Sequence, residues 1–307
     1  MKKTIVILLS LILFACSSKQ SESISIAVPS GAPSLAFYDE LDNNSFNTGD
    51  AQSILPELLS DNGSDIIVID TVNGIKALNK GANYQLAATI TFGNFYIAST
   101  GNDENDVMED GDYIVVFSQG ATPDLVFHYI YGEKLDSNLH YVQAVSDASA
   151  CLIKGINIAD NQNKVDYVMI AEPALSAALS QNNNASVYGN IQDEYANKTD
   201  GLSMIQASVF VSNRLSKDVT NQYLSDLENT INDMLSNPQI FEEATSALED
   251  AEIKDIFGIP NSKIATKVLS NNSIGLGYKK AYDNKQAIDQ FISLFDMETT
   301  NEEIYIK

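Results

Sequence analysis

Two carboxylates, Asp70 and Glu172, each stand at the end of an apolar stretch of the chain. A pair of carboxylates facing one another could share acid–base chemistry or accept hydrogen bonds from a bound molecule. Each also has a structural alternative, since Asp70 suits a helix N-cap and Glu172 suits the first turn of a helix, where negative charge complements the helix dipole. We expect the two carboxylates to bind rather than to catalyse.

The other side chains that could do chemistry lack the partners that chemistry needs. His128 falls inside a predicted helix and His140 beside the start of a predicted strand, so a structural role is expected for both. Neither gives metal-ligand spacing with Cys151, and Ser118 lacks a Gly-x-Ser-x-Gly elbow. Gly-rich phosphate loops are missing from the sequence. The sequence therefore predicts no catalytic residue, no metal and no cofactor.

A small polar loop, residues 118–122, follows the apolar run 113–117 and precedes a predicted helix. Thr122 is a good N-cap residue, Pro123 suits the first helical position, and Asp124 complements the positive helix end. The backbone N–H groups of Gly120 and Ala121 would lie near that helix N-terminus, at the carboxyl edge of a sheet where α/β proteins place ligands. The alternative is a strand-to-helix turn that binds nothing.

These residues must be positioned by an alternation of strands and helices that runs through most of the chain. The fold class predicted from it is α/β, with two doubly wound three-layer lobes and a largely helical end. Loops at the carboxyl ends of parallel strands would then line one cleft between the lobes. Strands are predicted at residues 25–28, 45–47, 65–70, 84–91, 96–98, 113–117, 141–144, 166–170, 185–188, 206–211 and 274–278. Helices are predicted at residues 34–41, 51–60, 75–79, 123–131, 148–155, 173–181, 219–235, 240–248, 262–269 and 279–295.

The N-terminus reads as an export signal. Lys2 and Lys3 precede an apolar run, residues 4–14, that is too short to span a bilayer as a stable helix. The small residue Ala15 before Cys16 resembles the lipobox of bacterial lipoproteins. The resemblance implies a signal peptide at 1–15, a lipidated Cys16 and a tether at 16–23; the alternative is an ordinary signal peptide in which Cys16 is incidental. Cys151 would then be alone, as a buried small hydrophobe.

The charge balance excludes some partners. The formal net charge is −23 over 307 residues, with no basic cluster, so nucleic acid and anionic lipid head groups are poor partners. The only arginine is Arg214, predicted on the surface just past the strand at 206–211, so a bidentate clamp on an anion is largely unavailable. A neutral or cationic ring that contains nitrogen fits the acidic chain better. Aromatic side chains that could stack on such a ring are Tyr38, Phe92, Phe95 and Tyr96.

Four short motifs in order, residues 29–33, 88–96, 119–124 and 171–175, resemble the substrate-binding lipoproteins of ABC importers. The branch is the one similar to nitrate, taurine and thiamine-pyrimidine binding proteins. The resemblance implies a type II periplasmic-binding fold in which hinge strands near 90–96 and 206–211 join two lobes. One lobe would comprise residues 24–91 and 210–307, and the other residues 95–206.

Carried over position by position, the resemblance also implies the ligand contacts. They are Ser30, Gly31, Asp70, Thr71, Gly93, Asn94, Ser118, Gln119, Gly120, Ala121, Thr122 and Glu172. The function implied is an exported, lipid-anchored monomer, not an enzyme, that captures a small solute by closure and delivers it to an ABC permease. The alternative is a surface lipoprotein of the same fold that acts as a sensor or as an enzyme on a small cyclic metabolite.

Overall fold

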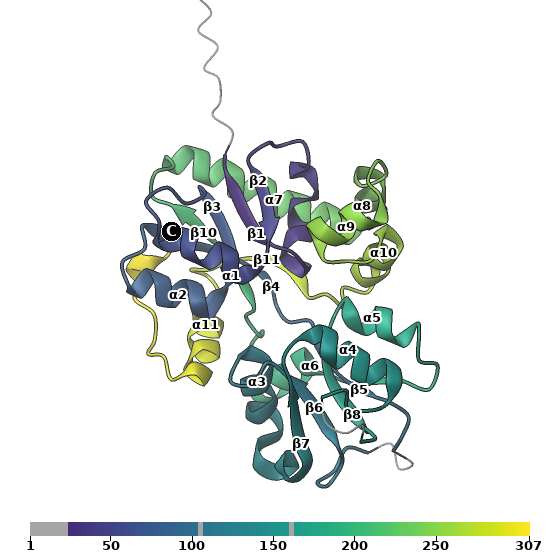
Figure 1. The fold of residues 1–307 in the computed structure, drawn as a ribbon. Coiled ribbons are helices and arrows are strands. Elements are labelled where there is room, and N and C mark those ends of the chain that lie inside the picture. The colour runs from purple at the N-terminus through teal and green to yellow at the C-terminus, as the bar shows by residue number, and fades with distance from the viewer. Residues whose placement is uncertain (1–23, 104–106, 160–162) are drawn as a thin grey trace, which may run out of the picture.

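The apolar runs of the sequence form the strands of two sheets in the computed structural model, which describes residues 24–103, 107–159 and 163–307 (Figure 1). The first, sheet A, has six strands in the order β11-β4-β10-β3-β1-β2. Its strands are β1 (Ile26–Pro29), β2 (Phe46–Gly49), β3 (Ile66–Asp70), β4 (Tyr84–Thr91), β10 (Ala207–Ser212) and β11 (Leu276–Lys280). We call sheet A with the helices packed on it lobe 1.

Sheet B has five strands in the order β7-β6-β8-β5-β9, and we call it, with its helices, lobe 2. Its strands are β5 (Phe95–Ser99), β6 (Ile114–Phe117), β7 (Leu139–Val142), β8 (Tyr167–Ala171) and β9 (Ser186–Asn190). The two-lobed α/β fold predicted from the sequence is confirmed. The chain passes from sheet A to sheet B between β4 and β5, and it returns between β9 and β10.

The sheets are mixed rather than wholly parallel. β6 pairs in parallel with β7 and β8, and β1 pairs in parallel with β2 and β3. The strands next to the two crossings run the other way: β5 is antiparallel to β8 and β9, and β10 is antiparallel to β3 and β4. The expectation that every strand-end loop meets at one edge therefore holds only for the parallel strands.

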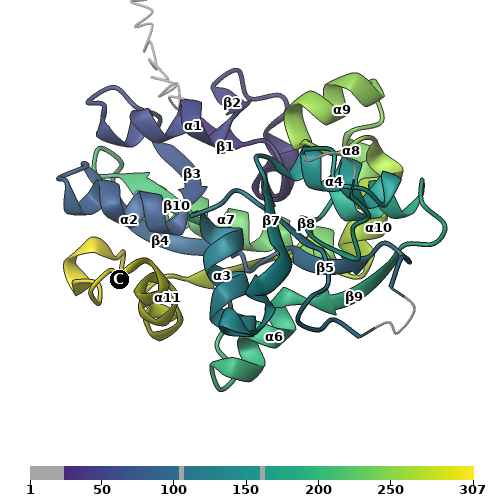
Figure 2. The ribbon, with the colours of Figure 1, turned by 60° about the horizontal axis from the view of Figure 1, so that its bottom comes forward.

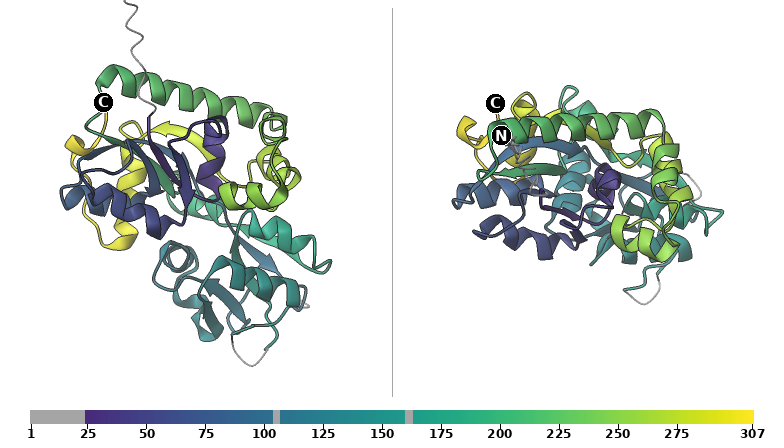
Figure 3. Two further views of the ribbon diagram at one scale, coloured as in Figure 1. Left: turned by 45° about the horizontal axis from the view of Figure 1, so that its top comes forward. Right: turned by 90° about the horizontal axis from the view of Figure 1, so that it is seen from above.

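Helices cover both faces of sheet A, because its central strands are apolar on both sides. In β3 the side chains of Ile67 and Ile69 pack into one cluster and those of Ile66 and Val68 into another, and all four are at most 1% exposed. The long helix α7 lies across one face of lobe 1 (Figure 3). The helical segments of lobe 1 are η1 (Ala32–Glu40), α1 (Ala51–Ile54), η2 (Leu55–Leu59), α2 (Thr71–Asn79), α7 (Lys217–Ser236), α8 (Gln239–Ala244), α9 (Asp250–Phe257), α10 (Ser262–Ser270), α11 (Lys285–Ile292), η4 (Ser293–Phe295) and η5 (Glu302–Ile304).

The helical segments of lobe 2 are α3 (Thr122–Tyr131), η3 (Gly132–Asn138), α4 (Val145–Lys154), α5 (Ala174–Leu179) and α6 (Ile191–Lys198). Three of them contact lobe 1: α5 lies beside α10, and α3 and α6 lie beside α11 and η4 (Figures 1 and 2). There the rings of Tyr195 and Phe291 are 5.9 Å apart, so one apolar cluster runs through both lobes.

Several helix predictions differ from the structure. The helices α6 and α9 were not predicted, because each is short and buries only two side chains of its eight residues: Ile191 and Tyr195 in α6, Ile253 and Phe257 in α9. The helix predicted from residue 279 begins at Lys285, since residues 279–280 pair with β4 as part of β11.

The predicted signal peptide, the tether and Cys16 lie outside the described residues. None of the helices that the structure describes has the length and apolar character needed to cross a bilayer. The thiol of Cys151 is fully buried, as expected for a small hydrophobic side chain.

Candidate functional site

The loop of residues 118–122 lies at the carboxyl end of β6, where the chain turns sharply into α3. Ser118 and Gly120 both have positive φ values, 57° and 74°. The Ser118 N–H donates to the Val142 carbonyl at 2.9 Å and its hydroxyl to the Gln143 carbonyl at 3.1 Å, which fixes the loop to the end of β7. Residues 119–121 are exposed, but the N–H groups of Gly120 and Ala121 already donate within the loop, to Asp124 Oδ2 at 2.7 Å and to the Ser118 carbonyl at 3.0 Å.

The start of α3 differs from the prediction. The N-cap residue is Ala121, and Thr122 is the first residue of the helix, so the prediction of Thr122 as N-cap is wrong. The loop is instead held by the carboxylate of Asp124, whose Oδ2 accepts a hydrogen bond from the Gly120 N–H at 2.7 Å. The Thr122 hydroxyl is thereby left to contact the other lobe, where it donates to Asp70 Oδ2 at 3.5 Å.

Asp124 is buried and holds a small polar network beneath the loop. Its Oδ1 accepts from the Tyr141 hydroxyl at 2.9 Å and lies 3.1 Å from His128 Nε2. The Tyr141 oxygen and His128 Nε2 are themselves 3.0 Å apart. His140 lies elsewhere, with its ring stacked on that of Tyr113 at 3.8 Å. These contacts give both histidines a place in the packing of lobe 2.

Asp70 ends β3 and caps α2. Its Oδ1 accepts a hydrogen bond from the Asn73 N–H at 2.9 Å. Its Oδ2 accepts a hydrogen bond from the hydroxyl of Thr122, which belongs to lobe 2. Burial raises the pKa of Asp70 above its usual value, although the hydrogen bond from Asn73 and the charge of Lys76 oppose the shift. One carboxylate thus performs the capping role and also joins lobe 1 to the loop of lobe 2.

Thr71 is fully buried, and its polar groups bond to the second crossing. Its N–H and hydroxyl donate to the carbonyl of Gln206 at 3.0 and 3.3 Å, and its Oγ1 lies 2.7 Å from the hydroxyl oxygen of Ser208. In this structure Thr71 therefore positions the chain where it re-enters sheet A.

Asn94 joins the two crossings to the end of β8. Its Nδ2 donates to the Glu172 carbonyl at 2.6 Å, and its own carbonyl accepts from the Glu172 N–H at 2.9 Å. Its Oδ1 accepts from Gln206 Nε2 at 3.0 Å. Asn94 is 6% exposed, so these bonds are held inside the protein.

Gly93, next to it, lies where loops from three parts of the chain meet. A Cβ on Gly93 would be 2.1 Å from Cε of Met204, and a Cβ on Gly275 would be 1.9 Å from the carbonyl oxygen of Gly93. The Phe92 N–H donates to the carbonyl of Gly275 at 2.8 Å. Close approach of backbone to backbone thus fixes the first crossing.

The Glu172 carboxylate also contacts the opposite lobe. Its Oε2 and Oε1 accept from the N–H and hydroxyl of Ser176 at 2.9 and 2.8 Å, which anchors it at the start of α5. Oε1 also accepts from the hydroxyl of Ser273, a residue of lobe 1, at 3.1 Å. The Tyr96 hydroxyl donates to the Ser273 carbonyl at 2.9 Å, and burial together with the charge of Glu172 raises the pKa of Tyr96 to about 12.

Ser30 and Gly31 contact a different element. The Ser30 hydroxyl donates to the carbonyls of Asp255 and Ile256 at 2.8 and 3.0 Å, so it binds the last turn of α9. Gly31 has a φ of 126° and lies close to Gly258. A Cβ added to Gly258 would lie 2.9 Å from the backbone nitrogen of Gly31. These two residues tie the end of β1 to α9.

Arg214 lies at the opposite end of β3 from Asp70. Its guanidinium donates to the Asp61 carbonyl at 2.7 Å and to Asp65 Oδ1 at 3.1 Å, and its side chain is 39% exposed. The only arginine of the chain is therefore committed to a surface ion pair away from the polar network between the lobes.

The structure joins part of the predicted set in two hydrogen-bonded groups, which together make up the polar network between the lobes. Asp70 bonds to Thr122 in one group, and Thr71, Asn94 and Glu172 are connected directly or through Gln206 in the other. Each group has a bond that crosses between the lobes, from Thr122 to Asp70 and from Ser273 to Glu172. Sequence reasoning missed two members, Gln206 and Ser273. The sequence could have indicated Gln206, because this residue begins a strand that is predicted as a hinge. Ser273 lies in a turn whose composition gives no such indication.

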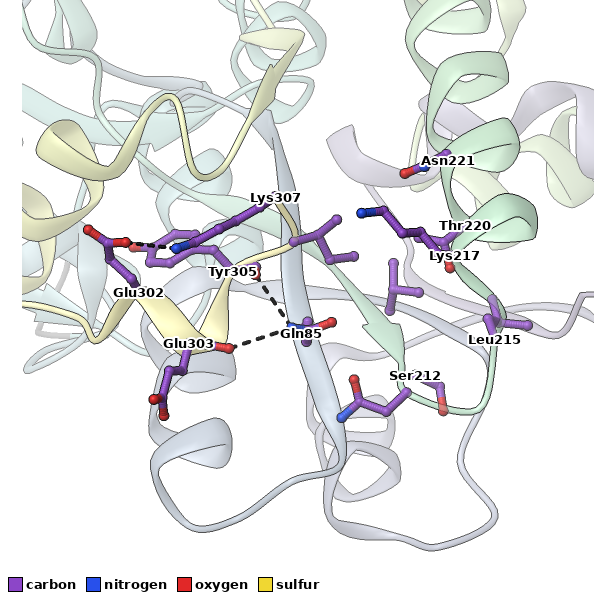
Figure 4. Close-up of a pocket in the computed structure, with 13 residues that line it drawn as sticks. Gln85, Ser212, Leu215, Lys217, Thr220, Asn221, Glu302, Glu303, Tyr305 and Lys307 are labelled. Atoms are coloured by element: carbon purple, nitrogen blue, oxygen red, sulfur yellow. Dashed lines mark hydrogen bonds and ion pairs between the residues drawn. The ribbon is translucent and has the colours of Figure 1, made fainter.

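A separate cavity of about 490 Å³ lies on lobe 1, between the end of β10, the start of α7 and the C-terminal segment (Figure 4). Gln85 Nε2 donates there to the carbonyl of Tyr305 at 3.4 Å, and Lys307 pairs with Glu302 at 2.8 Å. The thirteen described residues that line the cavity include none of the predicted ligand contacts.

Comparison with known proteins supports the fold assignment. No protein-family profile matches the chain, and no curated protein matches it. Several solved structures, however, match most of the chain. An ABC transporter structure from Parabacteroides distasonis matches with a TM-score of 0.69 and 22% identity, covering 89% of this chain and 91% of the other.

Two further structures extend this likeness. The periplasmic aliphatic sulphonate binding protein from Escherichia coli matches with a TM-score of 0.62 and 13% identity over 92% of each chain. The ligand-binding component of an ABC-type import system from Staphylococcus aureus, with zinc bound, matches at 0.61 and 11% over 92% of this chain and 96% of the other. The chain thus has the periplasmic-binding fold that it shares with these transport and binding proteins.

Proposed function

We propose that this protein is an extracytoplasmic solute-binding lipoprotein of an ABC importer. It captures a small solute between its two lobes, closes, and delivers the solute to a permease. The fold supports the general role, and the site and mechanism rest on the polar network between the lobes. The observation that carries the proposal is that carboxylates of both lobes, Asp70 and Glu172, bond to hydroxyls of the opposite lobe.

Closure would take place about the two crossings, near residues 90–96 and 206–211. Both crossings are held by backbone contacts, Phe92 to Gly275 and Gln206 to Thr91, so they can stay fixed while the lobes rotate. The contact between Thr122 and Asp70 is long, at 3.5 Å, and would be exchanged for contacts to a solute at little cost. Affinity would then come from bonds made only in the closed state.

The proposed ligand contacts are those predicted from the sequence, with the exposed loop of residues 119–121 nearest to solvent. A neutral or cationic ring that contains nitrogen suits the network, because Arg214 is bound elsewhere and the network has two carboxylates. Three of the aromatic side chains proposed to stack on the ring already have partners. Lys279 Nζ lies 5.2 Å from the centre of the Phe92 ring. Phe95 packs edge-on against Phe117 at 5.8 Å, and Tyr96 bonds to Ser273.

The proposed anchor is a lipid on Cys16, at the extracytoplasmic face of a bacterial membrane, and the proposed state is a monomer. The test is membrane fractionation and intact-mass measurement of the full chain beside Cys16→Ser. We expect the full chain in the membrane fraction with the added mass of a diacylglyceryl group, and the variant without that mass. An unmodified full chain would contradict the lipoprotein assignment.

The test of solute capture is native mass spectrometry of the full chain, extracted in mild detergent without denaturation. A small co-purifying mass, or saturable binding in a titration with pyrimidines, amines or sulfonates, is expected. Saturable binding of taurine or nitrate in place of the nitrogen-containing rings would refute the ring preference. If no member of such a panel binds, the proposed function is wrong.

A further inference from the structure

Gln206 contributes a buried acceptor that has no donor within the described protein. Its Oε1 is inaccessible to solvent and has no hydrogen-bond partner. Every other polar group of this residue is used: the N–H donates to the Thr91 carbonyl at 3.0 Å, the carbonyl accepts from Thr71, and Nε2 donates to Asn94. A buried carbonyl oxygen that lacks a donor is costly, because it has lost its bonds to water and gained nothing in exchange.

The orientation of the Gln206 amide follows from a chain of contacts that ends on a backbone group. The carbonyl oxygen of Glu172 can only accept, so the Asn94 atom 2.6 Å from it must be the amide nitrogen. Asn94 therefore presents its Oδ1 to Gln206, and the Gln206 atom 3.0 Å from that oxygen must be its nitrogen. The unpartnered atom is then an oxygen, and it needs a donor.

The neighbouring groups do not supply that donor. The Thr71 hydroxyl has a single hydrogen, and its oxygen is already in contact with the Gln206 carbonyl and the Ser208 hydroxyl. The Asn94 amide is committed to Glu172, and the Glu172 carboxylate is itself an acceptor that Ser176 and Ser273 already fill. The oxygen lies in a network shared by both lobes, so a donor can reach it when the lobes separate and close again.

We infer that Gln206 is a specificity-determining residue that accepts a hydrogen bond from an N–H group of the bound solute. The inference rests on the proposed function and names the chemistry of its solute: a donor-bearing nitrogen compound, neutral or cationic. Asp70 and Glu172, the carboxylates that bond across the lobes, favour the same class, since an anion would add negative charge to a region that already holds two carboxylates.

The test uses pairs of probes that differ in their N–H groups, titrated into the full chain in detergent. Suitable pairs are 4-aminopyrimidine with 4-(dimethylamino)pyrimidine, uracil with 1,3-dimethyluracil, and urea with tetramethylurea; methanesulfonate and nitrate are added as anions that lack N–H. We expect binding only among the N–H probes, and an affinity loss of about tenfold or more for the methylated partner of the best one.

Three variants assign that discrimination to Gln206. Gln206→Met removes the acceptor at similar length and is expected to reduce the discrimination to less than about threefold, whereas Gln206→Glu keeps an oxygen there and retains it. Gln85→Met, which removes an amide on the far side of lobe 1, is the matched control and should behave as the parent chain.

The outcomes separate the inference from the proposed function. Equal binding of methylated and unmethylated partners by the parent chain, or unchanged discrimination in Gln206→Met, would overturn the inference and leave solute capture intact. A structure with bound probe in which only water contacts Gln206 Oε1 would do the same. If no probe binds and no solute co-purifies, the proposed function fails and the inference falls with it. If Gln206→Met does not fold, the difference in affinity between the methylated and unmethylated probes for the parent chain still tests the inference.

Discussion

The hydroxyl of Ser273 lies 3.1 Å from Oε1 of Glu172, and this hydrogen bond joins lobe 1 to lobe 2 where α10 faces α5 (Figure 1). Glu172 does not depend on it, because Ser176 already donates twice to the same carboxylate. Removing the Ser273 hydroxyl therefore breaks a contact between the lobes without leaving a buried charge unpaired.

Ser273→Ala is expected to shift the protein toward more open arrangements of the lobes. The free energy of unfolding should fall by less than about 1 kcal/mol, since one hydrogen bond is lost and its partner stays satisfied. The measurement is small-angle scattering, with urea unfolding alongside. Ser270→Ala, which removes a hydroxyl bonded only within α10, is the matched control. An unchanged radius of gyration in Ser273→Ala would mean that this bond does not restrain the lobes.

Asp70 caps α2 and is partly buried, and two substitutions separate the effects of these two properties. Asp70→Ala loses the bond to the Asn73 N–H and should destabilise the protein by about 1 kcal/mol, whereas Asp70→Asn keeps a good N-cap. Urea unfolding at neutral pH measures both. If Asp70→Asn costs as much as Asp70→Ala, the cap is not what Asp70 contributes.

The pH dependence of Asp70 has a definite sign. Because burial raises its pKa in the folded state, the folded protein holds this proton to a higher pH than the unfolded chain does. The contribution of Asp70 to stability therefore declines as pH rises from the ordinary carboxyl pKa through the raised one. The difference in stability between Asp70→Asn and the parent chain should grow in favour of the variant over that interval. A difference that stays constant with pH would contradict the raised pKa.

Asp65, at the other end of β3, is expected to behave in the opposite way. Burial alone would raise its pKa, but hydrogen bonds from Ser25 and the guanidinium of Arg214 outweigh burial and lower it. The stabilisation is present above the unfolded pKa and is lost as pH falls through the folded one. Asp65→Asn should cost roughly 1 kcal/mol at neutral pH, a modest figure because the pair is partly exposed, and less in acid. Equal losses at pH 7 and pH 3 would rule out this linkage.

The strands were predictable because their signal is local. Continuous apolar runs such as residues 66–69 become buried on both faces, and the strand predicted at residues 84–91 is β4 with the same bounds. The direction of β5 and β10 was not predictable, since pairing partners distant in the sequence decide it. The short helices α6 and α9 were missed because two buried side chains give too weak a period to detect.

The site was predictable by position and less so by role. Asp70 and Glu172 do stand at strand ends, but the sequence could not reveal that each carboxylate would bond to a hydroxyl of the opposite lobe. Thr122 has the right residue type for an N-cap, yet Asp124 bonds to Gly120 and the Thr122 hydroxyl turns to Asp70. The unpartnered oxygen of Gln206 is a property of three-dimensional packing, and nothing in the sequence indicates it.

The last prediction compares two glycines that share a left-handed backbone but differ in their surroundings. Gly275 has a φ of 66° and Gly120 a φ of 74°. An added Cβ at Gly120 meets nothing within 4 Å, whereas at Gly275 it would lie 1.9 Å from the carbonyl oxygen of Gly93. Gly120→Ala should therefore cost only the backbone strain, about 1 to 2 kcal/mol.

Gly275→Ala should cost more than about 3 kcal/mol, because the obstructing atom belongs to backbone and the same loops are tied by the bond from Phe92 to Gly275. Urea unfolding of both variants gives the comparison. Since Gly93 lies at the first crossing between the lobes, Gly275→Ala should also alter the separation of the lobes in small-angle scattering, while Gly120→Ala should not. Similar losses of stability for the two variants would mean that the contact between residues 93 and 275 relaxes easily and does not fix the crossing.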